Sequence, residues 1–193
     1  MPGRRSKLSR FDFLPTSISG LTLVQRKRYE DERGFLSRFY CAREFETAGM
    51  RKAISQINHT LTHRAGAVRG MHYQTPPHAE LKVVSCLHGE IFDVAVDLRQ
   101  GSPTFMKWHG EVLSAQNQRS LLIPEGFAHG FQALGNDCEI VYLHTAAYEQ
   151  SAEAALNPLD SRLEIGWPMP ITEMSERDRN HPMVAADFEG IQQ

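Results

Sequence analysis

Cysteine is scarce in this sequence. Cys41, Cys86 and Cys138 are the only three, and no two of them form a CxxC pair. We therefore expect neither a disulfide framework nor a zinc knuckle, and a reducing cytoplasm is the simplest location. No apolar run approaches the length that crosses a bilayer, so no membrane partner is expected. The basic first ten residues lack the apolar stretch of a signal peptide.

Neither positive nor negative charge is in large excess. Lysine and arginine number 21, aspartate and glutamate number 23, and the net charge is −2, which gives no case for a nucleic-acid partner. The 193 residues are 41% hydrophobic, which is enough for one globular domain with a sizeable core. We expect a flexible tail over residues 1–15 and a single domain over residues 16–193.

Short β-rich segments separated by turns make up the middle of the chain. Residues 91–98 alternate, with Phe92, Val94, Val96 and Leu98 on one face and smaller or acidic residues on the other. Beyond residue 151 the pattern favours loops and short helices. Further strands are expected over 81–87, 120–124 and 139–145, and one helix over 42–48 that ends at Gly49. The whole pattern predicts a mainly β sandwich or barrel with a few short peripheral helices.

Several polar residues stand within these apolar segments. His72 shares a strand face with Gly70 and Gln74, and Lys82 lies in an otherwise apolar strand. A buried, unpaired lysine is costly, so taken alone Lys82 is expected to face solvent. Tyr142 shares its face with His144, and a tyrosine in a strand is usually a packing residue. Each residue by itself is thus compatible with an ordinary structural role.

One stretch raises the question of a metal. Residues 124–129 read P-x-G-x-x-H, which resembles the second half of the cupin metal motif. The first half requires a second histidine, but the sequence here is His72-Tyr73-Gln74, and an amide is a poor ligand for a transition metal. We expect a cupin-type barrel without a metal, with His63 or His78 as the residues that would have to replace the missing ligand.

Six segments together resemble one known family. They are DERGF at 31–35, VRGMHYQ at 68–74, GEIFDVAVDLRQGSPTF at 89–105, LSAQNQR at 113–119, IPEGFAHGF at 123–131 and GWP at 166–168. In this order they resemble the dTDP-4-dehydrorhamnose 3,5-epimerases. The resemblance implies a cupin-type jelly roll without metal or cofactor, a homodimer, and a dTDP-4-keto-hexose substrate that is epimerised at C3 and C5.

The resemblance also implies roles for individual residues. Four of them are catalytic: His72 as base, Asp178 as its orienting partner, Lys82 as the cation at the enolate oxygen and Tyr142 as the acid. The substrate-binding positions that it implies are Arg33, Phe35, Gln56, Asn58, Arg69, Arg119, His129 and Tyr148. Arginines suit a diphosphate because guanidinium binds phosphate in a bidentate manner.

The chain departs from the family pattern in three places, of which the first is a longer N-terminus. Leu143 replaces a lysine after the tyrosine, and residues 155–164 replace an aromatic segment. These departures leave open a 3-only epimerase or a sugar 3,4-ketoisomerase. A non-catalytic cupin that binds a sugar nucleotide needs no acid–base set, and a metal-dependent cupin dioxygenase needs the missing histidine. The resemblance therefore favours an isomerase.

Overall fold

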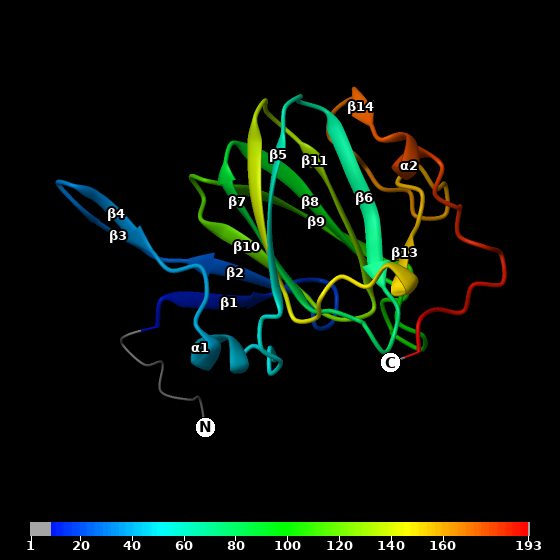
Figure 1. Cartoon of the computed structure of the whole chain (residues 1–193), viewed down its shortest axis with the longest axis horizontal. Helices are drawn as coiled ribbons and strands as arrows, with labels where there is room; N and C mark the ends of the chain where they lie inside the picture. Colours follow the sequence, from blue (N-terminus) through cyan, green and yellow to red (C-terminus); the bar gives the residue numbers. More distant parts are fainter. Residues whose placement is uncertain (1–8, 193) are drawn as a thin grey trace.

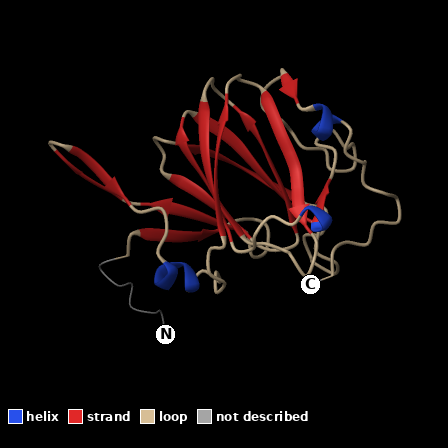
Figure 2. Cartoon of the chain, in the orientation of Figure 1, coloured by secondary structure: helices blue, strands red, loops and turns tan. Residues whose placement is uncertain are grey.

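Two six-stranded β-sheets face each other in this computed structural model, which describes residues 9–192 (Figures 1 and 2). Sheet I has the strand order β1-β2-β10-β7-β12-β5. Sheet II has the order β13-β6-β11-β8-β9, with β14 added beside β6. All neighbouring strands are antiparallel except β14 and β6. The predicted mainly β architecture is confirmed.

The strands of sheet I are β1 Phe11–Pro15, β2 Thr22–Arg26, β5 Gln56–Thr62, β7 Lys82–His88, β10 Arg119–Ile123 and β12 Cys138–His144. Those of sheet II are β6 Ala67–Gln74, β8 Glu90–Asp97, β9 Trp108–Ser114, β11 Phe127–Ala133, β13 Glu153–Ala155 and β14 Glu173–Met174. The remaining elements are the hairpin β3 Arg28–Asp31 and β4 Gly34–Ser37, the helices α1 Ala42–Glu46 and α2 Glu176–Arg179, and the 3₁₀ turn η1 Gln150–Ala152. The strands predicted from the sequence are all present, each shifted by one residue.

The main core fills the space between the sheets. Val84 and Ile140 of sheet I pack there against Ala95 and Phe131 of sheet II. The alternation predicted for residues 91–98 is confirmed, but both of its faces are buried. The polar face points inward because Asp93 pairs with a histidine in the interior. One end of the sandwich interior is therefore polar.

Each sheet is covered on its outside by a different part of the chain. Phe45 of α1 covers Val83 and Leu122 of sheet I. The segment 156–191, in orange to red at the right of Figure 1, covers Val94 and Val96 of sheet II. This segment is mostly loop, as predicted. The predicted early helix is confirmed as α1, followed by a turn to Gly49, whose φ is +96°.

The expected boundary of the N-terminal tail at residue 15 is wrong. Phe11–Pro15 form β1, which pairs with β2, and the Phe11 ring is buried against Phe45. Alternating Phe11 and Phe13 supply the apolar face that makes this segment a strand. The rest of the expected tail, residues 1–8, lies outside the described residues. No helix in the described part of the chain is long and apolar enough to cross a membrane.

The hairpin of β3 and β4 extends away from the sandwich as an arm (Figure 1). Tyr29, Phe35 and Leu36 on this arm are exposed, with Leu36 at 70%. Arg33 near its tip pairs with Asp31. The Arg10 guanidinium lies over the Tyr29 ring and that of Arg28 over the Phe35 ring, but all three apolar side chains stay largely exposed.

Candidate active site

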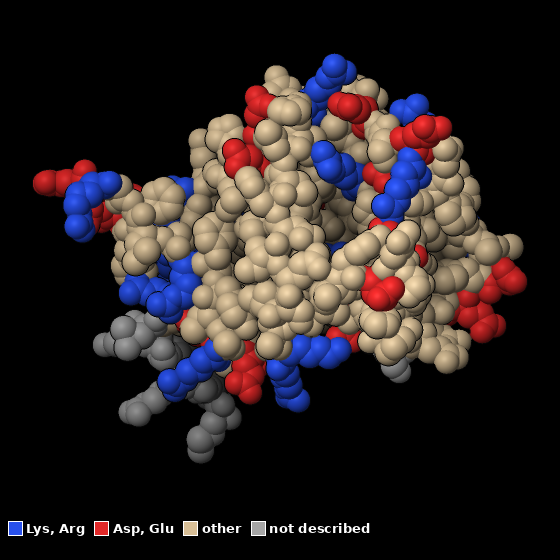
Figure 3. Space-filling model, in the orientation of Figure 1, with Lys and Arg blue, Asp and Glu red and all other residues tan. Residues whose placement is uncertain are grey.

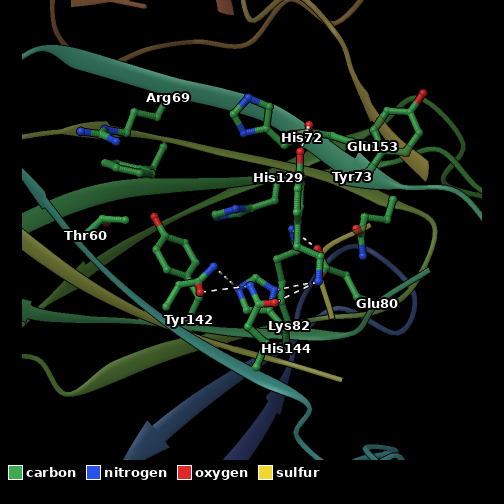
Figure 4. Close-up of a pocket in the computed structure, with 15 residues that line it drawn as sticks. Thr60, Arg69, His72, Tyr73, Glu80, Lys82, His129, Tyr142, His144 and Glu153 are labelled. Atoms are coloured by element: carbon green, nitrogen blue, oxygen red, sulfur yellow. Dashed lines mark hydrogen bonds and ion pairs between the residues drawn. The ribbon is translucent and has the colours of Figure 1, made fainter. Parts of the chain in front are cut away.

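A pocket of about 250 Å³ opens between the two sheets at the polar end of the sandwich. β5, β7 and β12 supply one wall, and β6 and β11 supply the other. Figure 4 shows His72 entering from β6, with Lys82, His144 and Tyr142 below it. The pocket thus brings together residues that are far apart in the sequence.

His72 is held by Asp178. His72 Nε2 lies 2.8 Å from Asp178 Oδ1, and the backbone N–H of Gly70 donates to Oδ2 of the same carboxylate. Burial alone would raise the pKa of Asp178, but the hydrogen bond and charge of His72 outweigh it and lower that pKa. Asp178 therefore stays ionised and fixes the orientation of the His72 ring.

Two features of the chain bring this pair together. β14 runs parallel to the start of β6, and Ser175 caps the short helix α2 by accepting from the Asp178 N–H. Gly70 and Gly130 cross at close range, since a Cβ on Gly70 would lie 2.5 Å from the Cα of Gly130. This crossing accompanies an irregularity in the β6–β11 register that sets His72 opposite His129. A side chain at either glycine would force the two strands apart.

Lys82 is buried, contrary to the solvent-facing position expected from the strand alone. Its exposed fraction is 6%, and its Nζ lies 3.0 Å from Glu80 Oε1. The other oxygen of Glu80 lies 2.6 Å from His144 Nδ1. The β7–β12 register places His144 directly opposite Lys82. One carboxylate is thus shared by a lysine and an imidazole at the bottom of the pocket.

Tyr142 and His129 complete the interior. Their rings meet edge to face with centroids 6.1 Å apart, and the His144 ring stacks on Tyr142 at 6.0 Å. Burial raises the pKa of Tyr142, so its phenol stays protonated at neutral pH. Burial lowers the pKa of His129, although the charge of Asp93, 2.7 Å away, opposes this shift. The pocket therefore contains a protonated phenol and three histidine–carboxylate pairs.

The Glu80 network predicts a specific dependence of stability on pH. Burial alone would raise the pKa of Glu80, but His144 and Lys82 lower it from 4.5 to about 2. Because the folded-state pKa is depressed, this contribution is present above pH 4.5 and is lost as the pH falls toward 2. The shift corresponds to about 3 kcal/mol.

Glu80→Gln should therefore flatten the dependence of the unfolding free energy on pH between 4.5 and 2, as measured by urea titrations. Glu30→Gln, on an exposed carboxylate 3.7 Å from Arg28, is the control and should leave the slope nearly unchanged. An unaltered slope in Glu80→Gln would show that the network does not hold the carboxylate ionised.

Most of the residues implied by the family resemblance meet at this pocket. His72, Lys82 and Tyr142 line it, and Asp178 lies directly behind His72. Of the implied substrate-binding residues, those at the pocket wall are Gln56, Asn58, Arg69, His129 and Tyr148. Their individual roles stay predictions.

Three implied residues lie elsewhere in the described chain. Arg33 and Phe35 are on the exposed arm, and Arg119 pairs with Glu111 of β9 at 2.6 Å. None of them lines the pocket of its own chain. The substrate-binding roles implied for these three residues stay predictions.

Sequence reasoning missed other residues at the site. Glu80, Asp93, His144 and His181 were given no role, although His144 shares a strand face with Tyr142 and Asp93 lies on the polar face of β8. Burial, followed by the charge of His72, lowers the pKa of His181. Asp93 and His144 pair with groups far away in the sequence, which no local pattern reveals, whereas His181 lies only three residues from its partner Asp178.

Gln74 stands where the cupin metal motif has its second histidine, and its side chain binds the backbone of neighbouring loops. The Gln74 amide donates to the carbonyls of His78 and Ala147, and its oxygen accepts from the Glu149 N–H. Gln74 is therefore fully engaged in holding loops together. His63 and His78, the possible replacement ligands, do not line the pocket.

A β-sandwich whose interior holds a carboxylate-paired histidine, a buried lysine and a protonated phenol has the groups that an isomerase of the proton-transfer type requires. The profile of one family, described as dTDP-4-dehydrorhamnose 3,5-epimerase, matches residues 15–186. The chain belongs to this family.

Individual relatives agree with this assignment. The dTDP-4-dehydrorhamnose 3,5-epimerase of Shigella flexneri is 42% identical over 177 residues, which cover 91% of this chain and 97% of the relative. A crystal structure of the 3,5-epimerase from Legionella pneumophila Philadelphia 1, in complex with dTDP-4-keto-L-rhamnose, has a TM-score of 0.88 and 36% identity, covering 95% and 99% of the two chains. A 3′-monoepimerase from Streptomyces bikiniensis, in complex with dTDP-quinovose, has a TM-score of 0.80 and 32% identity, covering 88% and 86%.

Proposed function

We propose that this enzyme epimerises a dTDP-4-keto-6-deoxyhexose at C3 and C5. The observation that carries the proposal is one pocket with His72, backed by Asp178, on one sheet and Lys82 and Tyr142 on the other. The family and the dTDP-sugar complexes of its relatives support the class of substrate.

The chemistry requires a base, a cation and an acid. A ketone at C4 acidifies the C–H bonds at C3 and C5, and removing such a proton leaves negative charge on the C4 oxygen. With Nε2 of His72 facing Asp178, Nδ1 is the nitrogen left to take the proton. The Lys82 ammonium stabilises the oxyanion, and the Tyr142 phenol returns a proton from the opposite ring face. Return from the opposite face inverts the carbon.

The test is turnover of a dTDP-4-keto-6-deoxyhexose in D₂O, followed by NMR after exhaustive treatment with EDTA. Deuterium at C3 and C5 with inversion at both carbons is the expected result, because no proposed step uses a metal or cofactor. Deuterium at C3 alone after long incubation would make this a 3-epimerase, an activity that one structural relative has. Loss of activity on EDTA treatment would contradict the metal-free mechanism.

Tyr142→Phe separates the two halves of the reaction. Abstraction needs only His72 and Lys82, so exchange at C3 should continue, while inversion should fall by about 10² or more because the acid is missing. The ratio of deuterium incorporation to inverted product measures this difference. An equal fall in both quantities would contradict the assignment of Tyr142 as the acid.

We also propose a homodimer in which the arm of one chain contacts the pocket of the other. The arm carries exposed Tyr29, Phe35 and Leu36, while Ile57 and Leu61 are exposed on the edge strand β5. Figure 3 shows a broad uncharged surface in the region of β5. Apolar surface of this kind is typical of protein interfaces. Arg33 and Phe35, which lie away from their own pocket, would then reach the pocket of the second copy.

Mixing two inactive variants tests this arrangement. Arg33→Ala damages the arm but keeps the base, and His72→Asn removes the base but keeps the arm. In random dimers of the two, half of the molecules have one intact site, so about a quarter of the activity should return. No recovery after co-refolding, or a monomer by sedimentation, would contradict the proposal.

The cytoplasmic location predicted from the scarcity of cysteine is also proposed. All three cysteines are unpaired.

A further inference from the structure

His181 brings a second imidazole to the His72–Asp178 pair. His181 Nε2 lies 3.3 Å from Asp178 Oδ1, and His72 Nε2 lies 2.8 Å from the same oxygen. The two rings meet edge to face with centroids 5.4 Å apart. His181 Nε2 is buried and has no hydrogen-bond partner in the described chain. Two imidazoles thus converge on one carboxylate oxygen, and only one of them is satisfied.

The spacing of these atoms suits a metal ion. The three donor atoms lie within 4.8 Å of one another, and no other cluster of three such ligands occurs in residues 9–192. Two ligands bound 2.0 Å from a tetrahedral ion lie about 3.3 Å apart. The His181–Asp178 separation already has this value, and the His72–Asp178 separation needs to widen by about 0.5 Å.

We propose that His72, Asp178 and His181 form a binding site for a divalent transition-metal ion of the Zn²⁺ type, which inhibits the enzyme. Two imidazoles, one carboxylate and a water are a donor set that zinc accepts. On binding, the proton between His72 and Asp178 is released to solvent, because both ligands must be deprotonated.

The surroundings of the site are compatible with an entering ion. The Gly70 N–H holds Oδ2 of Asp178, so Oδ1 stays turned toward the two rings. A second cavity of about 610 Å³ reaches His72 and Asp178 without Lys82 or Tyr142 in its wall, which carries the charged residues Arg64, Arg69, Glu173 and Arg177. An ion can therefore reach the pair from outside the substrate pocket.

Inhibition follows from the exchange of partners and rests on the proposed role of His72. With the metal on Nε2, a cation replaces the Asp178 carboxylate as the nearest charge to the ring. A nearby cation disfavours protonation of the other nitrogen, so Nδ1 no longer accepts a proton from the sugar.

Binding is tested with Co²⁺ alone on the full chain stripped with EDTA. The expected result is a visible d–d spectrum that saturates at one ion per chain and is displaced by Zn²⁺. His181→Ala should weaken binding at least about 100-fold. His59→Ala, which removes an exposed histidine 2.9 Å from Glu139, is the matched control and should change nothing. If His181→Ala does not fold, His181→Gln carries the same comparison.

Lack of stoichiometric Co²⁺ binding, or unchanged affinity in both His181 variants, would overturn the site. The inhibitory half is tested by solvent exchange with added Zn²⁺. The wild type should lose activity and regain it with EDTA, while His181→Ala should need about 100-fold more Zn²⁺. Binding of the ion without loss of activity would overturn the proposal that the ion inhibits the enzyme. An enzyme inactive even without metal would refute the proposed function, and the Co²⁺ spectrum would still decide the site.

Discussion

His72→Asn is expected to abolish proton exchange at both C3 and C5. Asparagine has an amide that can still donate to Asp178, but it has no group that accepts a proton near neutral pH. Positioned bases typically contribute 10²–10⁴-fold, so we expect a loss of at least about 10³ in the exchange rate. Deuterium incorporation from D₂O, measured by NMR at each carbon, reports the two steps separately.

The matched control is His63→Asn. His63 also lies 2.8 Å from a carboxylate, Asp137, but its side chain is exposed and does not line the pocket. Its loss should leave exchange unchanged. Normal exchange in His72→Asn would mean that another group is the base, and His144, paired with Glu80, would be the next histidine to replace.

Lys82→Met should lower kcat by about 10²–10³, the usual effect of removing a donor that stabilises an oxyanion. The charge on the C4 oxygen develops only after proton removal, so KM should change much less than kcat. Steady-state kinetics with the 4-keto sugar measure both constants. A comparable change in KM alone would indicate that Lys82 binds substrate and does not stabilise the enolate.

A second variant separates this electrostatic effect from a structural one. Lys82→Met leaves the buried Glu80 with His144 as its remaining partner, which should also lower stability. The double variant Lys82→Met/Glu80→Gln removes the unpaired charge, so stability should recover while kcat stays low. Lys52→Met, at the exposed Lys52–Glu125 ion pair, is the control for losing a lysine. Recovery of kcat in the double variant would contradict the proposed role of Lys82.

The strands were predictable from two local signals. Residues 91–98 alternate, while 81–87 and 139–145 are β-rich segments beside turns, and the structure moves each of them by one residue. Phe11–Pro15 was missed because its alternation is only two phenylalanines long and follows a basic stretch. What decides that segment is the distant Phe45, which buries Phe11.

The site was predictable only through the family resemblance. Nothing local distinguishes Lys82 from a solvent-facing lysine, because its burial depends on Glu80 and on His144 from another strand. Asp178 reaches His72 through the pairing of β14 with β6 across 106 residues. Arg33 and Phe35 show the opposite case. The family resemblance implies that they bind substrate, whereas in the single chain they lie on the arm, away from the pocket.

The segment 156–191 both supplies Asp178 to His72 and covers the outer face of sheet II, and this affects the order in which the parts of the protein fold. β12, the last long strand, is synthesised well before Asp178, so the pocket walls can assemble on a nascent chain whose base still lacks its partner. The same segment covers Val94 and Val96, which stay open to water until it docks. Completion of the His72–Asp178 pair and burial of that apolar face therefore both wait until this segment is synthesised and docks, and proteolysis that removes the segment would undo both.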